Sequence, residues 1–280
     1  MDLCNYHSHC TFCDGRASAE DFVNAAIEAG FHSYGISSHS PLPFETDWSL
    51  KRSEVGNYLR EMQRLKRIYA SMLEVYVGLE IDYLNDEYGP SSLYFQQLPL
   101  DYRIGSVHYV VNPERGEMMD MDGRVEDFRR NLDKVFAGDL KLLIKNYFQA
   151  SMRMVELGGF DFVAHADKVA MNGSLCDPEI VDSNWFRNMM MDYLRVIAEK
   201  GVMMEINTKA YGRRGMLFPD VRYFKELREL KIPLMVNSDA HEPEKINQGR
   251  AEVFGLLREA GIRSTVHLRK GFWEETEITV

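Results

Sequence analysis

The sequence predicts an α/β fold in which parallel strands alternate with helices and close into a barrel. Apolar segments of strand length alternate with amphipathic segments of helical spacing about seven times along the 280 residues. This alternation is typical of a parallel sheet with helices outside it, and barrels of this kind reach such a length as one unit. No shift in composition marks a linker, so residues 1–280 are expected to form a single domain.

The first half of the chain opens with a strand predicted at residues 3–6. Ser18 and Asp21 match a capping box at the start of a helix, and Gly30 is expected to end that helix. A long amphipathic helix is predicted over residues 53–73, because apolar residues recur there at helical spacing. The other elements of this half are strands at residues 33–38, 75–84 and 102–111, and a short helix at 92–97.

The second half continues the alternation after an irregular acidic loop, predicted at residues 112–123. Helical spacing then continues past Gly138 to about Leu157. Strands are expected at residues 160–166, 202–207 and 232–237, and helices at residues 185–199, 224–230 and 248–260. A short apolar run at residues 265–268 precedes a polar tail.

Composition favours a water-soluble globular protein, with 45% hydrophobic and 27% charged residues. The net charge of −10 argues against a nucleic-acid-binding surface but not against an anionic substrate, because bound cations invert the local sign. No apolar run has the length of a membrane span. Four cysteines without a signal peptide predict a cytoplasmic location, and nothing in the sequence indicates an oligomeric state.

Histidines and acids stand at the ends of the predicted strands, and this pattern carries the functional prediction. Working residues of parallel β/α barrels lie at the carboxyl ends of the strands. Six of the eight histidines fall there, together with Glu80 and Asp239. The histidines are His7, His9, His39, His108, His165 and His241. Imidazole and carboxylate side chains bind zinc, iron or manganese, so we expect a metal site.

The number of candidate ligands predicts more than one ion. Asp14, from the first loop, raises the set to nine, whereas one zinc or iron ion takes about four to six ligands. Two or three divalent ions are therefore expected, with Glu80 best placed to bridge them. Such a cluster generates hydroxide near neutral pH and holds the attacking and leaving oxygens of a phosphoryl transfer.

Cys10 and Cys13 leave a different chemistry open. They form a C-x-x-C pair beside His9, so a thioredoxin-type redox pair is an alternative to a position next to the metal site. Further acids and amides near the strand ends are expected to orient the histidines by accepting their second ring N–H. These residues are Asp82, Asp167, Glu205 and Asn207.

Seven short motifs resemble the polymerase and histidinol phosphatase (PHP) family in order and spacing over almost the whole chain. They are HSH at 7–9, SSH at 37–39, GLE at 78–80, SVH at 106–108, AHAD at 164–167, EINTKA at 205–210 and NSDAH at 237–241. The resemblance implies a distorted (β/α)7 barrel with a two- or three-metal site. The ligands it implies are His7, His9, His39, Glu80, His108, His165, Asp239 and His241. Many members have a further histidine where this chain has Gly15, and Asp14 beside it resembles the acid of other members.

Within that family, the length and the EINTK segment are most similar to the stand-alone histidinol-phosphate phosphatases. The resemblance implies a metal-dependent phosphomonoester hydrolase that converts L-histidinol phosphate to L-histidinol and phosphate. Glu80 is expected to bridge the metals, and Asp239 or His39 to manage protons. Lys209 is the favoured cation for the substrate phosphate, before Arg213 and Arg16.

Other functions fit parts of the same pattern. The site could act on another small phosphomonoester, a nucleotide or a DNA 3′ end, although the acidic chain disfavours nucleic acid. Amidohydrolase barrels also open with H-x-H but normally need a lysine at a mid-barrel strand end, which this chain lacks. A catalytically silent metal-binding protein is the third alternative. Loops at residues 41–50 and 117–122 are expected to be lids over the site.

Overall fold

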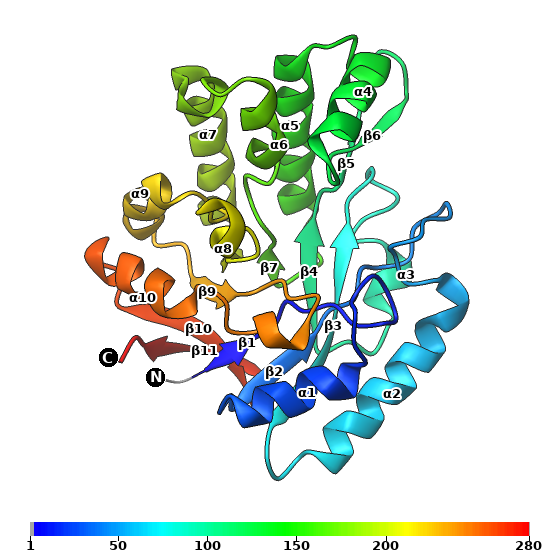
Figure 1. Cartoon of the computed structure of the whole chain (residues 1–280), viewed down its shortest axis with the longest axis vertical. Coiled ribbons are helices and arrows are strands. Elements are labelled where there is room, and N and C mark those ends of the chain that lie inside the picture. Colours follow the sequence, from blue (N-terminus) through cyan, green and yellow to red (C-terminus); the bar gives the residue numbers. More distant parts are fainter. Residues whose placement is uncertain (1–2, 280) are drawn as a thin grey trace.

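A computed structural model describes residues 3–279, and a seven-stranded parallel sheet forms its centre (Figure 1). Neighbouring strands follow the chain order, which confirms the predicted parallel α/β architecture. The strands are β1 (Cys4–Asn5), β2 (Ser33–Ile36), β3 (Glu74–Asp82), β4 (Tyr102–Ser106), β7 (Phe162–Val163), β8 (Met203–Asn207) and β9 (Leu234–Asn237).

The two edges of this sheet meet just beyond the carboxyl ends of β1 and β9. Ser8 forms a parallel bridge with Ala240, and the His9 backbone N–H donates to the Ala240 carbonyl oxygen at 2.8 Å. Side chains extend the junction, because the Tyr6 N–H donates to Asn237 Oδ1 at 2.9 Å. The sheet therefore curves into a nearly closed barrel, and the strand ends lie around one mouth.

Aromatic side chains fill the inside of the barrel. Tyr102 is fully buried, and its hydroxyl donates to the Tyr6 carbonyl oxygen at 2.7 Å. Its ring lies against Gly35 of β2 and Gly78 of β3, where a Cβ atom would come within 2.2 Å and 2.4 Å of Tyr102 atoms. Because glycine has no side chain, these two positions leave space for the Tyr102 ring inside the barrel.

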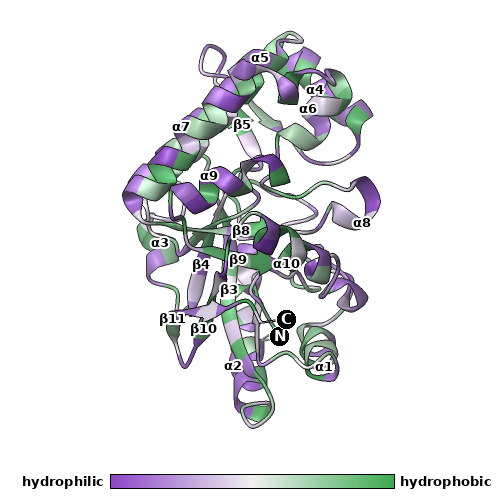
Figure 2. Ribbon diagram, turned by 90° about the vertical axis from the view of Figure 1, so that its left-hand side faces the viewer, coloured by the Kyte–Doolittle hydropathy of each residue, from purple (hydrophilic) through white to green (hydrophobic). Residues whose placement is uncertain are grey.

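Helices cover the outside of the barrel in two groups (Figure 1). In Figure 2, hydrophobic and hydrophilic residues alternate along α7, as expected for a helix with one buried face. The helices are α1 (Ala19–Glu28), α2 (Val55–Ile68), α3 (Leu93–Gln96), α4 (Val125–Phe136), α5 (Leu140–Leu157), α6 (Ala170–Cys176), α7 (Asn184–Lys200), α8 (Tyr211–Arg214), α9 (Phe224–Glu229) and α10 (Arg250–Glu259). No helix within residues 3–279 is long and apolar enough to cross a bilayer.

A hairpin of β10 (Ser264–Arg269) and β11 (Phe272–Glu277) covers the amino-terminal end of the barrel. Trp273 Nε1 donates to Asp161, which directly precedes β7, at 2.9 Å. The Lys270 N–H donates to Glu74, the first residue of β3, at 2.9 Å. The end of the barrel opposite the carboxyl ends of the strands is therefore closed by the β10–β11 hairpin.

The structure corrects three expectations. The acidic loop at 112–123 contains a strand, β6 (Met118–Asp120), which pairs with β5 (Tyr109–Val111), so the strand predicted at 102–111 is two strands. The helix predicted past Gly138 is broken into α4 and α5, because Ala137 and Gly138 adopt left-handed backbone angles, φ 52° and 79°. The polar tail forms β11, whose largely exposed residues hide the apolar alternation of a strand.

Candidate metal centre at the strand ends

All nine predicted ligand side chains lie together at the carboxyl-terminal mouth of the barrel. Glu80 lies within β3, and the others follow the ends of β1, β2, β4, β7 and β9. Seven of the nine are buried, and Asp14 and His241 are partly exposed. The parallel sheet explains the convergence, because the carboxyl ends of its strands share one edge.

Glu80 occupies the centre of the group, with an exposed fraction of 1%. Both of its carboxylate oxygens face imidazoles. Oε1 lies 2.8 Å from His165 Nε2 and 3.6 Å from His108 Nε2. Oε2 lies 2.9 Å from His39 Nδ1, 3.3 Å from His7 Nε2 and 3.5 Å from His9 Nε2. A carboxylate between two sets of imidazoles has the geometry of a bridging ligand.

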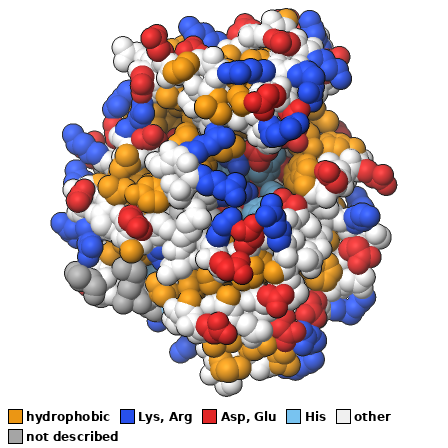
Figure 3. Space-filling model, in the orientation of Figure 1, with side chains coloured by type: hydrophobic (Ala, Val, Ile, Leu, Met, Phe, Trp, Pro, Cys, Tyr) orange, Lys and Arg blue, Asp and Glu red, His pale blue; other side chains and the backbone are white. Residues whose placement is uncertain are grey.

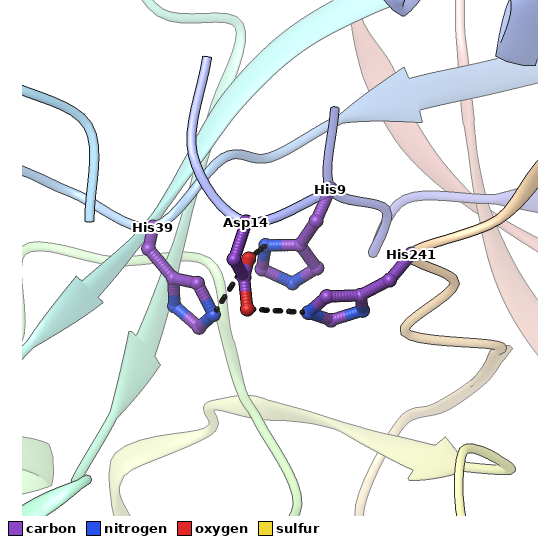
Figure 4. A group of neighbouring side chains, drawn as sticks. All are labelled: His9, Asp14, His39 and His241. Atoms are coloured by element: carbon purple, nitrogen blue, oxygen red, sulfur yellow. Dashed lines mark ion pairs between the residues drawn. The ribbon is translucent and has the colours of Figure 1, made fainter. Parts of the chain in front are cut away.

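Asp14 forms a second group with three histidines, His9, His39 and His241 (Figure 4). Its Oδ2 lies 3.2 Å from His241 Nε2, and its Oδ1 lies 3.7 Å from His39 Nε2 and 4.0 Å from His9 Nδ1. One ligand atom from each of the four side chains fits within 4.8 Å of all the others. Asp14 therefore lies where its carboxylate could bind a metal ion together with these three histidines.

Asp239 links the two groups from the end of β9. Its Oδ1 lies 3.2 Å from His9 Nε2, 3.6 Å from His241 Nδ1 and 3.2 Å from Lys209 Nζ. Its backbone is left-handed, with φ 49°, a conformation that aspartate tolerates better than most residues. The turn directs this carboxylate inward as the chain leaves the barrel.

Two further acids orient ligand histidines through contacts with the ring nitrogen Nδ1. Glu205 Oε2 lies 2.9 Å from His7 Nδ1, and Asp82 Oδ1 lies 2.9 Å from His108 Nδ1. Both leave the opposite ring nitrogen, Nε2, directed toward Glu80. Such contacts fix the tautomer and the direction of a ligand histidine.

Amide side chains complete this support. Asn207 Nδ2 donates to Glu205 at 2.7 Å, and Asn237 Nδ2 donates to the same carboxylate at 3.0 Å. The sequence prediction did not include Asn237, although it belongs to the NSDAH motif. Two residues differ from their predicted role of accepting a histidine N–H. Asp167 Oδ2 accepts the Asp220 N–H at 3.0 Å, and Asn207 Oδ1 accepts the Lys209 N–H at 3.0 Å.

The buried charges produce opposing pKa shifts in neighbouring histidines. Burial opposes protonation of His7, but the carboxylates of Glu205, Asp239 and Glu80 outweigh it and raise its pKa well above the usual value. Burial, with His39 and His241 nearby, lowers the pKa of His9 well below its usual value. The negative field that acts on His7 also favours a divalent cation, and a neutral imidazole such as that of His9 is the form that binds one.

The donor set fits divalent metal ions. Within residues 3–279, His7 Nε2, His9 Nε2 and Glu80 Oε2 are buried atoms without a hydrogen-bond partner, and all three face the same space. Buried polar atoms are normally paired, and metal coordination would satisfy these. Imidazole nitrogen and carboxylate oxygen are common ligands of zinc, iron and manganese.

A cavity of about 760 Å³ opens above this centre. Figure 3 shows histidines at the bottom of a hollow, with Lys and Arg side chains along its left edge and hydrophobic side chains along its right. Lys209 and Arg213 line the cavity, whereas Arg16 lines a neighbouring one and bonds to Glu242 at 2.6 Å. The acids around Lys209 overcome its burial and raise its pKa to about 12.

Lys168 is a further cation of the cavity that the sequence prediction missed. It is 4% exposed, and its Nζ lies 3.3 Å from Asp122 Oδ2. It directly follows the AHAD motif, and its partner Asp122 comes from the segment just after β6. No short-range pattern in the sequence predicted the contact between Lys168 and Asp122.

The cysteine pair lies beside the centre without the properties of a redox pair. Cys13 Sγ is 3.6 Å from His9 Nδ1, and Cys10 is buried against Ser38. Burial raises the pKa of both thiols, which disfavours the thiolate that exchange chemistry requires. The position supports the prediction that both cysteines are neighbours of the site.

Comparison with known proteins gives consistent matches. The family described as PHP domain matches residues 5–209. A Deinococcus radiodurans protein named probable histidinol-phosphatase is 27% identical over 277 residues, which cover 94% of this chain and 95% of that protein. The histidinol-phosphatase of Bacillus subtilis is 24% identical, over 84% of this chain and 92% of its own length.

A solved structure shares the fold over nearly the full length. The histidinol phosphate phosphatase of Lactococcus lactis, complexed with zinc, L-histidinol and phosphate, superposes with a TM-score of 0.71. The two chains are 18% identical, and the match covers 97% of this chain and 98% of that one.

Proposed function

Because the chain belongs to the PHP domain family, we propose that it is a phosphatase that hydrolyses L-histidinol phosphate to L-histidinol and phosphate. The observation that carries the proposal is the convergence of six histidines and three carboxylates on one mouth of the barrel, around Glu80. The relatives named histidinol-phosphatase, which align over most of the chain, support the choice of substrate.

The proposal includes two or three divalent ions, of zinc, iron or manganese. The ligands in this proposal are His7, His9, Asp14, His39, Glu80, His108, His165, Asp239 and His241. When bound, such ions supply Lewis acidity toward phosphoryl oxygens and lower the pKa of water. The zinc of the Lactococcus lactis complex supports a divalent metal.

Cationic side chains would bind and orient the phosphate. Lys209 is the strongest candidate, because its Nζ lies beside Asp239 and His241 and its pKa of about 12 keeps it charged. Arg213 is exposed on the wall of the same cavity and is a second candidate. Arg16 is the weakest of the three, because its side chain is 73% exposed and is paired with Glu242.

The reaction in this proposal is attack of water on phosphorus, in line with the ester oxygen. The bond between phosphorus and the ester oxygen breaks, and the alcohol leaves with a proton. Oδ1 of Asp239 or a ring nitrogen of His39 is the group that we expect to hold the water proton. Glu80, whose two carboxylate oxygens face different imidazoles, would hold the metal ions together as a bridging ligand and is catalytic in that sense.

Phosphate release from a panel of esters tests the proposal. The panel contains L-histidinol phosphate, phenyl phosphate, glucose 6-phosphate and AMP, each with and without a chelator. We expect the highest kcat/KM for histidinol phosphate, and its loss on chelation with recovery after metal is added back.

The panel also separates the alternatives. A clear preference for AMP or glucose 6-phosphate would replace histidinol phosphate by a nucleotide or another small monoester. Absence of metal-dependent hydrolysis for every ester, with metal present in the protein, would contradict phosphatase activity itself.

A further inference from the structure

The lining of the cavity above the metal centre carries charges of both signs. Its cations are Lys168, Lys209, Arg213 and Arg214, and Lys and Arg side chains lie along one edge of the hollow in Figure 3. Trp48 and the acids Asp47, Asp120 and Asp122 line the same cavity, and Asp122 forms an ion pair with Lys168. A bound molecule would therefore meet an aromatic surface and charges of both signs.

Trp48 is held in place beside the site. Its indole packs edge-on against the ligand His39, with ring centroids 4.7 Å apart. On the other side it stacks on Tyr109 of β5, with centroids 6.0 Å apart and an angle of 16° between the ring planes. An aromatic ring fixed in this way provides a binding surface for a flat ring or an organic cation.

Two carboxylates of this cavity lack a cationic partner. Asp122 pairs with Lys168, but among the described residues neither Asp47 nor Asp120 forms an ion pair with any Lys, Arg or His. Asp120 lies opposite Tyr109 in the β5–β6 register, so the hairpin carries the acid to the aromatic side. Burial and the nearby Asp122 raise the pKa of Asp120, and a cation placed beside it would relieve that cost.

L-Histidinol phosphate has a matching distribution of charge. Its phosphate is anionic, and its other end carries an ammonium group and an imidazole ring. With the phosphate over the metal centre, the cationic end would lie against Trp48, Asp47 and Asp120, which line the same cavity. The cation–aromatic and charge-assisted contacts available there suit both of its groups.

From this we propose that Trp48 and Asp120, with Asp47 beside them, form the subsite that recognises the amine and imidazole of the substrate. This inference rests on the proposed function and identifies the residues that select the leaving alcohol. The loop 41–50 and the β5–β6 hairpin thus act as specificity elements, and the metal centre carries the hydrolysis.

The test compares two esters in the metal-loaded enzyme. L-Histidinol phosphate carries both recognised groups, and phenyl phosphate carries neither, so the ratio of their kcat/KM values measures recognition. In Asp120→Asn we expect this ratio to fall about tenfold or more, mainly through KM for histidinol phosphate, because a neutral amide replaces a charged partner. Trp48→Leu should lower the ratio several-fold, and Trp48→Phe should restore most of it.

Controls separate recognition from folding. Glu117→Gln removes an exposed acid from the same hairpin, outside the cavity, and should leave the ratio unchanged. An unchanged ratio in both Asp120→Asn and Trp48→Leu would overturn the subsite, as would equal losses on the two esters. A wild-type enzyme that hydrolyses phenyl phosphate but shows no preference for histidinol phosphate would instead contradict the proposed substrate.

Discussion

Glu80 is the residue on which the candidate centre depends. It is almost fully buried, yet its pKa lies well below its usual value, because His7, His108 and His39 outweigh the cost of burial. A buried carboxylate that stays ionised and faces five imidazoles provides the negative charge that a cluster of cations needs. Its replacement should therefore affect metal binding and catalysis together.

Glu80→Gln keeps the shape of the side chain and removes its charge. We expect kcat for histidinol phosphate to fall by about 10²–10³-fold or more, with a lower metal content in the purified protein. Phosphate release and elemental analysis measure the two effects. Glu87→Gln, an exposed acid in the loop after β3, is the matched control and should retain both. Full activity of Glu80→Gln would rule out a central role for this carboxylate.

The histidines and acids at predicted strand ends located the site more accurately than the prediction of helices and strands described the local structure. Six histidines at predicted strand ends indicated the metal centre, because a parallel barrel brings such ends together whatever the length of each strand. Lys168 gave no comparable signal as a site residue, and Asn237 and Trp48 were covered only by the NSDAH motif and by the expected lid at residues 41–50. Their roles come from contacts between segments far apart in the chain, which spacing does not encode.

At the scale of elements, the seven parallel strands were predictable and the connections between them were not. The apolar spacing of α4 and α5 is continuous, so only the left-handed backbone at Ala137 and Gly138 separates the two helices. The β5–β6 hairpin has short strands with exposed residues, and its single buried position in β6, Met119, is too little to produce an alternating pattern. Tertiary contacts, and not the local sequence pattern, therefore determine the break between α4 and α5 and the formation of the β5–β6 hairpin.

A substitution at Gly78 tests how tightly the side chains inside the barrel pack around Tyr102. A methyl group there would come within 2.4 Å of the Tyr102 ring, which is enclosed by Tyr6, Phe162 and Trp273. We expect Gly78→Ala to lower the free energy of unfolding by about 1–3 kcal/mol, as other overpacked cores do.

Urea denaturation measures this change. Gly255→Ala in α10 is the control, because a Cβ there meets no described atom within 4 Å. It should raise stability by up to about 1 kcal/mol, through helix propensity. Equal effects of the two substitutions would argue against close packing around Tyr102.

At the scale of the whole molecule, the barrel is functional at one end and closed at the other. The β10–β11 hairpin fastens the C-terminal segment to the amino-terminal ends of the strands. His267 of β10 is buried and stacks on His32, which directly precedes β2, with centroids 5.6 Å apart. Burial, with the nearby His32 and Arg250, lowers the pKa of His267 to about 4.

The lowered pKa of His267 predicts that the folded protein loses stability at low pH. Between the usual histidine pKa of about 6.5 and the folded value of about 4, the unfolded chain binds a proton that the folded chain does not, so stability falls as the pH falls. The contribution of His267 is about 3 kcal/mol over that window. His267→Gln should remove this part of the pH dependence, as measured by denaturation at pH 7, 5.5 and 4. Parallel pH profiles for the variant and the wild type would contradict the assignment.

The central claim is that the mouth of the barrel holds a cluster of divalent ions around Glu80. Anomalous diffraction at the zinc, iron and manganese edges, from crystals of the purified protein, tests it most directly. We predict two or three peaks, each about 2.0–2.2 Å from imidazole nitrogens, with the Glu80 carboxylate between two of them. A single ion bound away from Glu80, or no peak among these side chains in metal-replete crystals, would contradict it.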